Sequence, residues 1–264
     1  MKHLFKIGGD INAKTSITIS IIGFTFICFV WLLITDISGL VKPATIPSPI
    51  SVLSSLHELF MKDALIYNSI YSIKLNMQGY IEAVLIAIPL GFIVALIPLF
   101  RSMFSRYIDA MRYIPITGLI GIFIAWFGIG LSMKAHFLAF GVMVYLLPVV
   151  IQRVYETDKI HLDTAWTLGA NSWQLFTKIY LPSVISKVFV DIRVITAISW
   201  TYIIVAEMVN NEGGVGAMIY SAAKQSRIDK IFAILLFIIF IGFIQDKLFQ
   251  IAEKQFFKFK FVKK

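Results

Sequence analysis

The sequence predicts an all-α, polytopic membrane protein with six transmembrane helices and both termini in the cytoplasm. Hydrophobic residues form 58% of the 264 residues and charged residues only 15%, and the mean hydropathy is +0.83, unlike a soluble domain. The apolar residues gather into runs of about 20 residues, enough to cross a hydrocarbon core of about 30 Å at about 1.5 Å per residue. Neither an internal repeat nor a separate soluble domain is visible in the sequence. We therefore interpret residues 1–264 as one transmembrane domain.

The basic residues indicate the orientation. The formal net charge is +9, but the lysines and arginines are divided among the segments between apolar runs and form no single basic face. This distribution indicates membrane topology rather than nucleic-acid binding. The segments that would be cytoplasmic hold most of them, as the positive-inside rule requires. The predicted spans are approximately residues 16–35, 76–100, 113–129, 135–151, 183–208 and 230–251.

The first span is too long for the apolar region of a signal peptide and is not clearly followed by a cleavage site, so we expect it to remain uncleaved. The only cysteine, Cys28, lies inside it and excludes an intrachain disulfide. Residues 36–65 follow, where prolines impose an extended segment and a short amphipathic helix is predicted along the outer surface. The helical pattern from 66 to 100 is longer than one span requires.

One basic cluster and two glycines frame the third span, residues 113–129. Arg101, Arg106 and Arg112 precede it and indicate a cytoplasmic segment. Trp126 is expected near the outer interface. The glycines that follow at 128 and 130 would permit a tight turn into the fourth span.

The fifth span, residues 183–208, is unusually charged. A charge in hydrocarbon costs at least about 2.5 to 3.5 kcal/mol, so such side chains should face the bundle interior, a partner or water. Lys187 and Asp191, one turn apart, form a predicted interfacial pair. Arg193 and Glu207, together with Trp126, are candidates for a pathway or structural role. Residues 209–229 are polar and rich in glycine, and the sixth span is followed by a basic, aromatic tail suited to the anionic inner leaflet.

Residues 152–182 form the longest interruption between apolar runs that has a helical pattern of its own. Ala165, Trp166 and Gly169 share one face of a short helix that should end near the glycine. Asn171 and Gln174 have the spacing of a capping box and predict a second short helix. Pro182 is expected to set the start of the next helix. Such a pair of helices could present a surface to a soluble partner or pack on its own bundle.

The spacing of six residues in this loop resembles the EAA loop of permease subunits of binding-protein-dependent ABC importers: Asp163, Ala165, Gly169, Ile179, Leu181 and Pro182. The family has Glu-Ala-Ala where this chain has Asp163, Thr164 and Ala165, while the glycine and the Ile-x-Leu-Pro ending match. The segments IPSP at 46–49 and WFGIG at 126–130 resemble the sulfonate, nitrate and taurine group of that family.

The resemblance implies the membrane-spanning subunit of an ATP-driven importer in a bacterial inner membrane. The six loop residues would then couple to an ABC ATPase and would not be catalytic. The implied partners are two ATPase subunits, an extracytoplasmic solute-binding protein and a second permease subunit, in a homodimer. The chain lacks a GxxxxGK[ST] loop, so ATP and Mg²⁺ are expected on the ATPase and no cofactor on this chain. The implied substrate is a small sulfonate-, nitrate- or taurine-like anion, or alternatively a vitamin precursor or small aromatic.

Two other classes of function remain as alternatives. A secondary transporter would use broken helices near mid-membrane, which the prolines permit, but six spans without a repeat fit that class poorly. An intramembrane enzyme would need a cluster of catalytic or metal-binding side chains. No Ser/His pair and no His, Cys or carboxylate cluster with metal spacing lies within the apolar runs.

Overall fold

A computed structural model describes residues 7, 9, 11–39, 41–209 and 212–260, and all regular elements within these ranges are helical. The all-α prediction is confirmed. Five helices are long and apolar enough to cross a membrane, and a sixth span is obtained if a helix pair bent by 95° counts as one. The chain folds as two compact units, Met1–Ala64 with Ser221–Leu236 and Leu65–Tyr220 with Phe237–Lys264. Residues 1–6 and the last part of the basic tail, 261–264, lie outside the described ranges.

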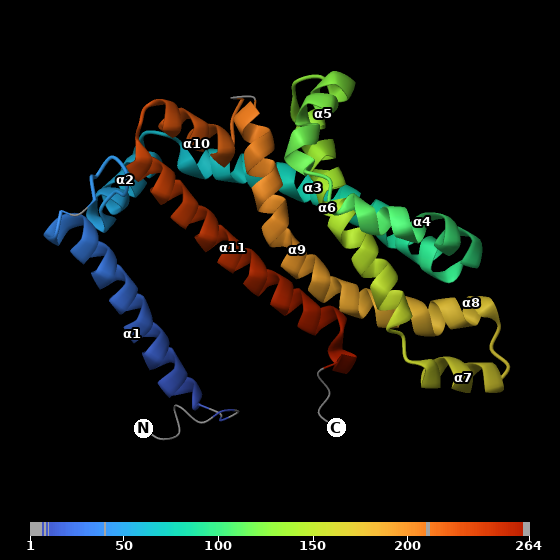
Figure 1. The fold of residues 1–264 in the computed structure, drawn as a ribbon. Coiled ribbons are helices and arrows are strands. Elements are labelled where there is room, and N and C mark those ends of the chain that lie inside the picture. The colour runs from blue at the N-terminus through green and yellow to red at the C-terminus, as the bar shows by residue number, and fades with distance from the viewer. Residues whose placement is uncertain (1–6, 8, 10, 40, 210–211, 261–264) are drawn as a thin grey trace. The chain divides into compact units, whose positions relative to one another are not determined.

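The first unit contains the N-terminal span and the amphipathic helix expected after it. Its helices are α1 (Ala13–Leu32), extended by a π-helical turn (Leu33–Ile37), and α2 (Pro49–Met61) (Figure 1). The side chain of Ser48 accepts a hydrogen bond from Ser51 N at 3.2 Å and so caps α2, with Pro49 at the first helical position. No residue of α1 is buried within the chain.

The second unit is built on two long helices that approach closely, α3 (Leu65–Leu96) and α6 (Leu131–Tyr155). A Cβ atom at Gly79 would lie 2.7 Å from the carbonyl oxygen of Ala135, and one at Gly91 would lie 2.5 Å from Val150 Cγ1. Small residues at such positions allow the helix backbones to approach each other. Helix α9 (Leu181–Val209) packs on both of them, and α10 (Val215–Lys224) and α11 (Ile228–Phe256) have residues in both units.

The predicted third span, residues 113–129, contains two short helical pieces and follows a sharp bend. The structure has a 3₁₀ turn (Ile116–Leu119) and a short helix α5 (Ile120–Phe127), preceded by a helix α4 (Pro98–Met111) bent by 95° from them. The second span likewise ends at Leu96 and not near residue 100. The physical reason is proline: Ile97 takes an extended conformation before Pro98, which then opens α4 from its first position.

The fourth, fifth and sixth predicted spans lie inside α6, α9 and α11. Helix α9 begins beside Pro182, as expected, but without a break from the preceding turns, because residues Ser172–Val209 form one continuous 38-residue helical stretch. A π-helical turn, Phe176–Tyr180, precedes the proline. Since Pro182 has no N–H and its ring crowds the carbonyl four residues earlier, at Lys178, a widened turn there accommodates it without ending the helix.

Candidate functional site

The turn at Gly169 ends the first helix of the 152–182 loop, α7 (Lys159–Thr167). Gly169 N donates to Trp166 O and Ala170 N donates to Ala165 O, both at 2.9 Å. These two bonds form a Schellman motif, in which the residue after the cap adopts a left-handed conformation, and Gly169 has a φ of +82°. The predicted helix end at this glycine is confirmed.

The second helix, α8 (Ser172–Leu175), begins with the capping box that the sequence predicts. Asn171 Oδ1 accepts from Gln174 N and Gln174 Oε1 accepts from Asn171 N, each at 2.9 Å. Together with the Schellman turn, this reciprocal pair fixes both sides of the connection formed by residues 168–171. The loop is therefore a defined helical hairpin.

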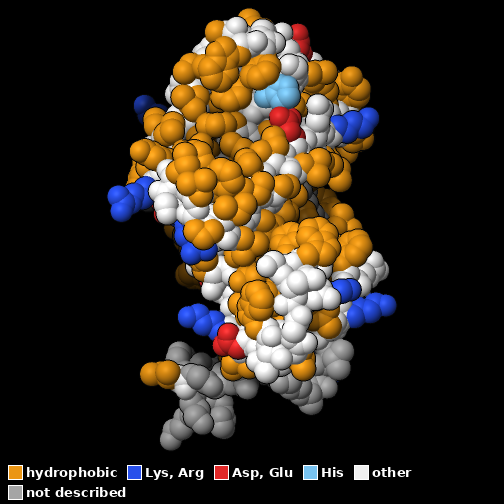
Figure 2. All heavy atoms as spheres, turned by 90° about the vertical axis from the view of Figure 1, so that its right-hand side faces the viewer, with side chains coloured by type: hydrophobic (Ala, Val, Ile, Leu, Met, Phe, Trp, Pro, Cys, Tyr) orange, Lys and Arg blue, Asp and Glu red, His pale blue; other side chains and the backbone are white. Residues whose placement is uncertain are grey.

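Large apolar side chains of this hairpin point away from the chain. The exposed fractions are 71% for Ile160, 56% for Trp166, 82% for Leu168 and 70% for Trp173. Figure 2, which shows the face that carries α4, α5, α7 and α8, displays hydrophobic side chains over much of its area. Exposed apolar groups gathered on one element are typical of an interaction surface. We call α7, α8 and their connection the hairpin surface.

The six residues of the EAA-like spacing divide between the two ends of this hairpin. Asp163 and Gly169 are exposed on α7 and its final turn, and Ala165 is half-buried there. Ile179 lies in the π-helical segment, and Leu181 and Pro182 begin α9. A Cβ atom at Gly169 would meet nothing within 4 Å. The left-handed conformation at residue 169 therefore favours glycine, whereas packing against the described residues leaves room for a side chain.

Glu207 is fully buried near the end of α9. Its carboxylate accepts from Ser72 Oγ on α3 at 2.6 Å and from Gly216 N on α10 at 2.8 Å. Ser72 Oγ in turn accepts from Val215 N at 2.9 Å, and Asn68 Oδ1 accepts from Gly214 N at 2.9 Å. A side chain at Gly214 would collide with the carboxylate. Glu207 thus holds the glycine-rich segment against α3.

The fully buried Lys134 at the start of α6 lies in the same region and interacts electrostatically with Glu207. Its Nζ also lies 5.7 Å from the centre of the Tyr71 ring. Sequence reasoning missed Lys134, Ser72 and Asn68. The Gly-Gly-x-Gly segment is the sequence signal for this site. Glycines let the backbone turn close to a helix, so that their N–H groups can donate to a buried acceptor.

Arg193 and Trp126, the other two candidates, lie in separate places. Arg193 Nε is 2.6 Å from Asp246 Oδ1 on α11, beside a cavity of about 270 Å³ that Trp200 also lines. The N–H of Arg193 is not aligned on that oxygen as a hydrogen bond. Trp126 on α5 is 71% exposed and packs at a tilt against Phe123, with 5.8 Å between ring centres. The structure does not bring Trp126, Arg193 and Glu207 together into one site.

The predicted pair of Lys187 and Asp191 is wrong. Asp191 instead binds Arg153 at the end of α6 through two hydrogen bonds of 2.7 Å, and Lys187 Nζ donates to the carbonyl oxygen of Glu156 at 2.9 Å. The planar guanidinium matches both carboxylate oxygens, which a flexible ammonium does not. Arg153 also hydrogen-bonds Glu156 and thereby lowers the pKa of that carboxyl. The cluster ties α6 to α9 where the hairpin begins.

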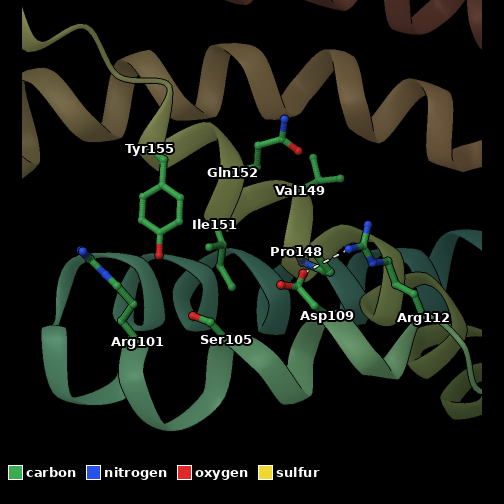
Figure 3. A pocket seen from close by; sticks show the side chains of 9 residues that line it. All are labelled: Arg101, Ser105, Asp109, Arg112, Pro148, Val149, Ile151, Gln152 and Tyr155. Carbon is green, nitrogen blue, oxygen red and sulfur yellow. Dashed lines mark hydrogen bonds and ion pairs between the residues drawn. The ribbon is translucent and has the colours of Figure 1, made fainter.

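A cavity of about 650 Å³ lies between α4 and the last turns of α6 (Figure 3). Its polar lining consists of Arg101, Ser105, Asp109 and Arg112 from α4 and Gln152 and Tyr155 from α6. The figure shows the α4 side chains pointing toward α6 and Tyr155 pointing back toward α4.

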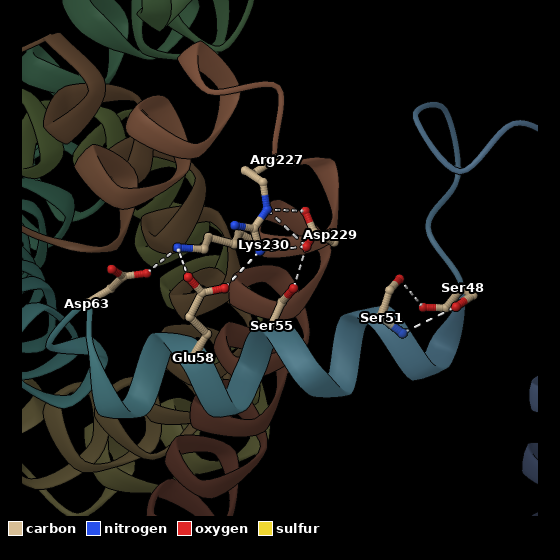
Figure 4. A network of polar contacts seen from close by, with 8 residues as sticks. All are labelled: Ser48, Ser51, Ser55, Glu58, Asp63, Arg227, Asp229 and Lys230. Carbon is tan, nitrogen blue, oxygen red and sulfur yellow. Dashed lines mark hydrogen bonds and ion pairs between the residues drawn. The ribbon is translucent and has the colours of Figure 1, made fainter.

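The first unit has a charged cluster that joins α2 to the start of α11 (Figure 4). Arg227 Nη2 lies 2.9 Å from Glu58 and 2.8 Å from Asp229, and Lys230 Nζ lies 2.6 Å from Asp63 and 3.2 Å from Glu58. Ser55 Oγ donates to Asp229 at 2.5 Å. The hydrogen bond from Arg227, and then that from Lys230, lower the pKa of Glu58.

Comparison with known proteins identifies the family. The model of the family described as "Binding-protein-dependent transport system inner membrane component" matches residues 87–258. A putative aliphatic sulfonates transport permease protein of Bacillus subtilis is 24% identical, covering 88% of this chain and 83% of the relative. The taurine transport system permease protein of Escherichia coli is 24% identical, covering 87% of this chain and 85% of the relative.

A solved structure of the MetNI methionine ABC transporter, in inward facing conformations, supports the same fold. One of its chains aligns with a TM-score of 0.61 at 17% identity, covering 73% of this chain and 94% of that chain. At this identity the likeness shows the fold alone. Because the family model spans more than half of the sequence, the chain belongs to the multi-pass inner membrane components of binding-protein-dependent ABC transport systems.

Proposed function

We propose that the hairpin surface is the docking element through which this permease engages an ABC ATPase. The observation that carries the proposal is the combination of a rigid turn and exposed apolar side chains. Leu168 and Trp173, 82% and 70% exposed, flank a connection held by the Schellman turn and the capping box. A preformed surface loses little conformational entropy on binding, so its apolar burial contributes to affinity. Asp163, Ala165, Gly169, Ile179, Leu181 and Pro182 are the proposed coupling residues.

The chain itself would carry out no catalysis. In this proposal, ATP and Mg²⁺ bind the partner ATPase, and hydrolysis there drives rearrangement of the membrane helices. The bidentate pair of Arg153 and Asp191 supports this transmission, because it fastens α6 to α9 beside the hairpin. A movement of the docked hairpin would then be passed to two spans at once.

A second copy of this chain is the proposed partner within the membrane. The support is α1, an apolar helix that is long enough to span a membrane and has no residue buried in the chain.

A solute-binding protein would deliver the solute at the opposite side from the hairpin. The proposed solute is a small sulfonate-like or taurine-like anion, because relatives named for aliphatic sulfonates and taurine align over most of this chain.

The docking proposal is tested by co-purification of the ATPase with permease variants. Gly169→Asp adds a charge at the proposed interface, whereas Gly169→Asn adds a neutral side chain that tolerates the left-handed conformation. Since a Cβ at this position meets nothing within 4 Å, both variants should insert and fold. We expect Gly169→Asp to lose the ATPase, Gly169→Asn to retain a substantial part, and the exposed control Lys159→Ala to behave as wild type. Full recovery of the ATPase with Gly169→Asp would refute docking at this surface.

A further inference from the structure

The cavity between α4 and α6 has a lining suited to an oxyanion. Arg101 is held in place at its wall, because Nε donates to the carbonyl oxygen of Ala95 at 3.1 Å and Nη2 donates to the same oxygen. This carbonyl lies in the last turn of α3. The carbonyls of that turn receive no hydrogen bond from residue 98, because a proline has no backbone N–H. The guanidinium has further N–H donors beyond these two. Its central carbon lies 5.2 Å from the centre of the Tyr155 ring, which restrains its orientation.

Ser105 supplies an independent observation. This residue lines the cavity, and its buried Oγ has no hydrogen-bond partner among the described residues. Other helix hydroxyls in this chain bond the carbonyl four residues earlier, as Thr164 does to Ile160 at 2.7 Å and Thr177 does to Trp173 at 2.8 Å. A buried hydroxyl that makes no such bond costs free energy unless it bonds something else.

Arg112 is the second cation of the cavity, and its present partner is exchangeable. It lies 3.1 Å from Asp109, and the two side chains are 49% and 63% exposed. Exposed ion pairs of this kind contribute little stability, so an incoming anion can replace the carboxylate. Two guanidinium groups and one carboxylate give the lining a net positive charge.

We propose that this cavity binds a phosphate or sulfonate group, with Arg101, Arg112 and Ser105 as its donors and Tyr155 against any apolar part that carries the group. Guanidinium groups suit such oxyanions because their planar N–H donors match the oxygen geometry. The opposite face of α4 exposes Leu99, Met103 and Tyr107, as a helix at the membrane interface does. The group could therefore belong to an anionic phospholipid or to a soluble anion.

The lipid source is tested with the assembled complex in nanodiscs that contain phosphatidylglycerol and phosphatidylcholine. After detergent release, native mass spectrometry counts the phosphatidylglycerol retained. Loss of a charge-assisted hydrogen bond should weaken retention about tenfold in Arg101→Gln, with a smaller loss in Ser105→Ala. Asp109→Asn should strengthen retention, because it removes the competing carboxylate. Arg106→Gln is the matched control, since it removes the same charge from α4 outside the cavity lining.

The soluble source is tested with the same variants in phosphatidylcholine alone, by titration with inorganic phosphate or methanesulfonate and measurement of the thermal midpoint. Stabilisation of wild type that is absent in Arg101→Gln and larger in Asp109→Asn would assign the site to a soluble anion. The proposal is overturned if, in both experiments, Asp109→Asn and Arg101→Gln behave as Arg106→Gln does. Asp109→Asn decides the question even if Arg101→Gln disturbs the end of α3.

Discussion

Glu207 is an acidic residue of the second unit that depends on buried hydrogen-bond partners. Its carboxylate is fully buried and accepts from Ser72 and Gly216. Removal of one partner from a buried charged network typically costs about 3 to 5 kcal/mol, because the remaining groups lose their compensation. We expect Glu207→Ala to lower the thermal midpoint of the purified protein strongly, whereas Glu212→Ala, which removes an exposed carboxylate, should leave it nearly unchanged. Equal effects of the two variants would mean that the network contributes no stability.

Two residues occupy the same left-handed position after a helix and offer opposite predictions. Gly169 follows α7 with a φ of +82°, and Ser226 follows α10 with a φ of +54°. Ser226 N and Arg227 N also donate in a Schellman pattern, at 3.0 and 2.9 Å, to Ala223 O and Ala222 O. A side chain in this conformation costs about 1 kcal/mol.

Gly169→Ala should therefore destabilise the end of α7, and Ser226→Gly should stabilise the end of α10. The hydrogen-exchange rates of the amides in these two turns measure both effects when each variant is compared with the wild-type protein. Faster exchange near residue 226 in the glycine variant would contradict the assignment, as would slower exchange near residue 169 in the alanine variant.

Among the secondary-structure elements, sequence patterns predict where the helices lie better than they predict where a helix begins, ends or continues. The apolar runs and the Asn171 and Gln174 capping box are local signals, and the structure contains the corresponding helices. The break at Pro98 and the continuity through Pro182 are different, because a proline can open a helix or be absorbed by a widened turn. Which outcome occurs depends on packing, such as the contact of Phe176 with Phe92 at 5.3 Å between ring centres.

The candidate sites show the same limit. The EAA-like spacing lies within 20 residues of sequence and could be recognised there. Glu207 could be singled out as a charge in an apolar run, but its partner Ser72 lies 135 residues away. The sequence pairs Asp191 with Lys187, because they are one helical turn apart, whereas the actual partner of Asp191, Arg153, lies on another helix. Long-range pairing of this kind is not contained in periodicity.

The charged cluster on α2 gives an element-scale prediction for acid. Its cations lower the pKa of Glu58 below 4.5. A carboxyl with a lowered folded-state pKa contributes stability that is present above its unfolded pKa and is lost as the pH falls through the folded value. The thermal midpoint of the wild-type protein should therefore fall progressively as the pH falls below 4.5, the ordinary pKa of a glutamate. Glu58→Gln should be less stable at neutral pH and should lose less between pH 4.5 and more acidic conditions; an identical pH profile for both proteins would contradict the assignment.

For the whole molecule, the predicted topology rests on the span count and the distribution of basic residues. With Cys28 replaced by Ala, single cysteines at residues 45 and 212 should react with an impermeant thiol reagent added outside intact cells. Cysteines at residues 106 and 170 should react with the reagent only after the cells are permeabilised. External labelling at residue 170 would place the hairpin surface on the wrong side for an intracellular ATPase.

Transport by this chain is expected to depend on ATP that a separate protein hydrolyses. The direct measurement is solute uptake into proteoliposomes that contain the permease and its ATPase, with the loaded binding protein outside and ATP inside. We predict uptake that requires both ATP and the binding protein, together with ATP hydrolysis stimulated by the loaded binding protein. Uptake that proceeds without ATP and follows an imposed ion gradient would contradict the account and assign the chain to a secondary transporter.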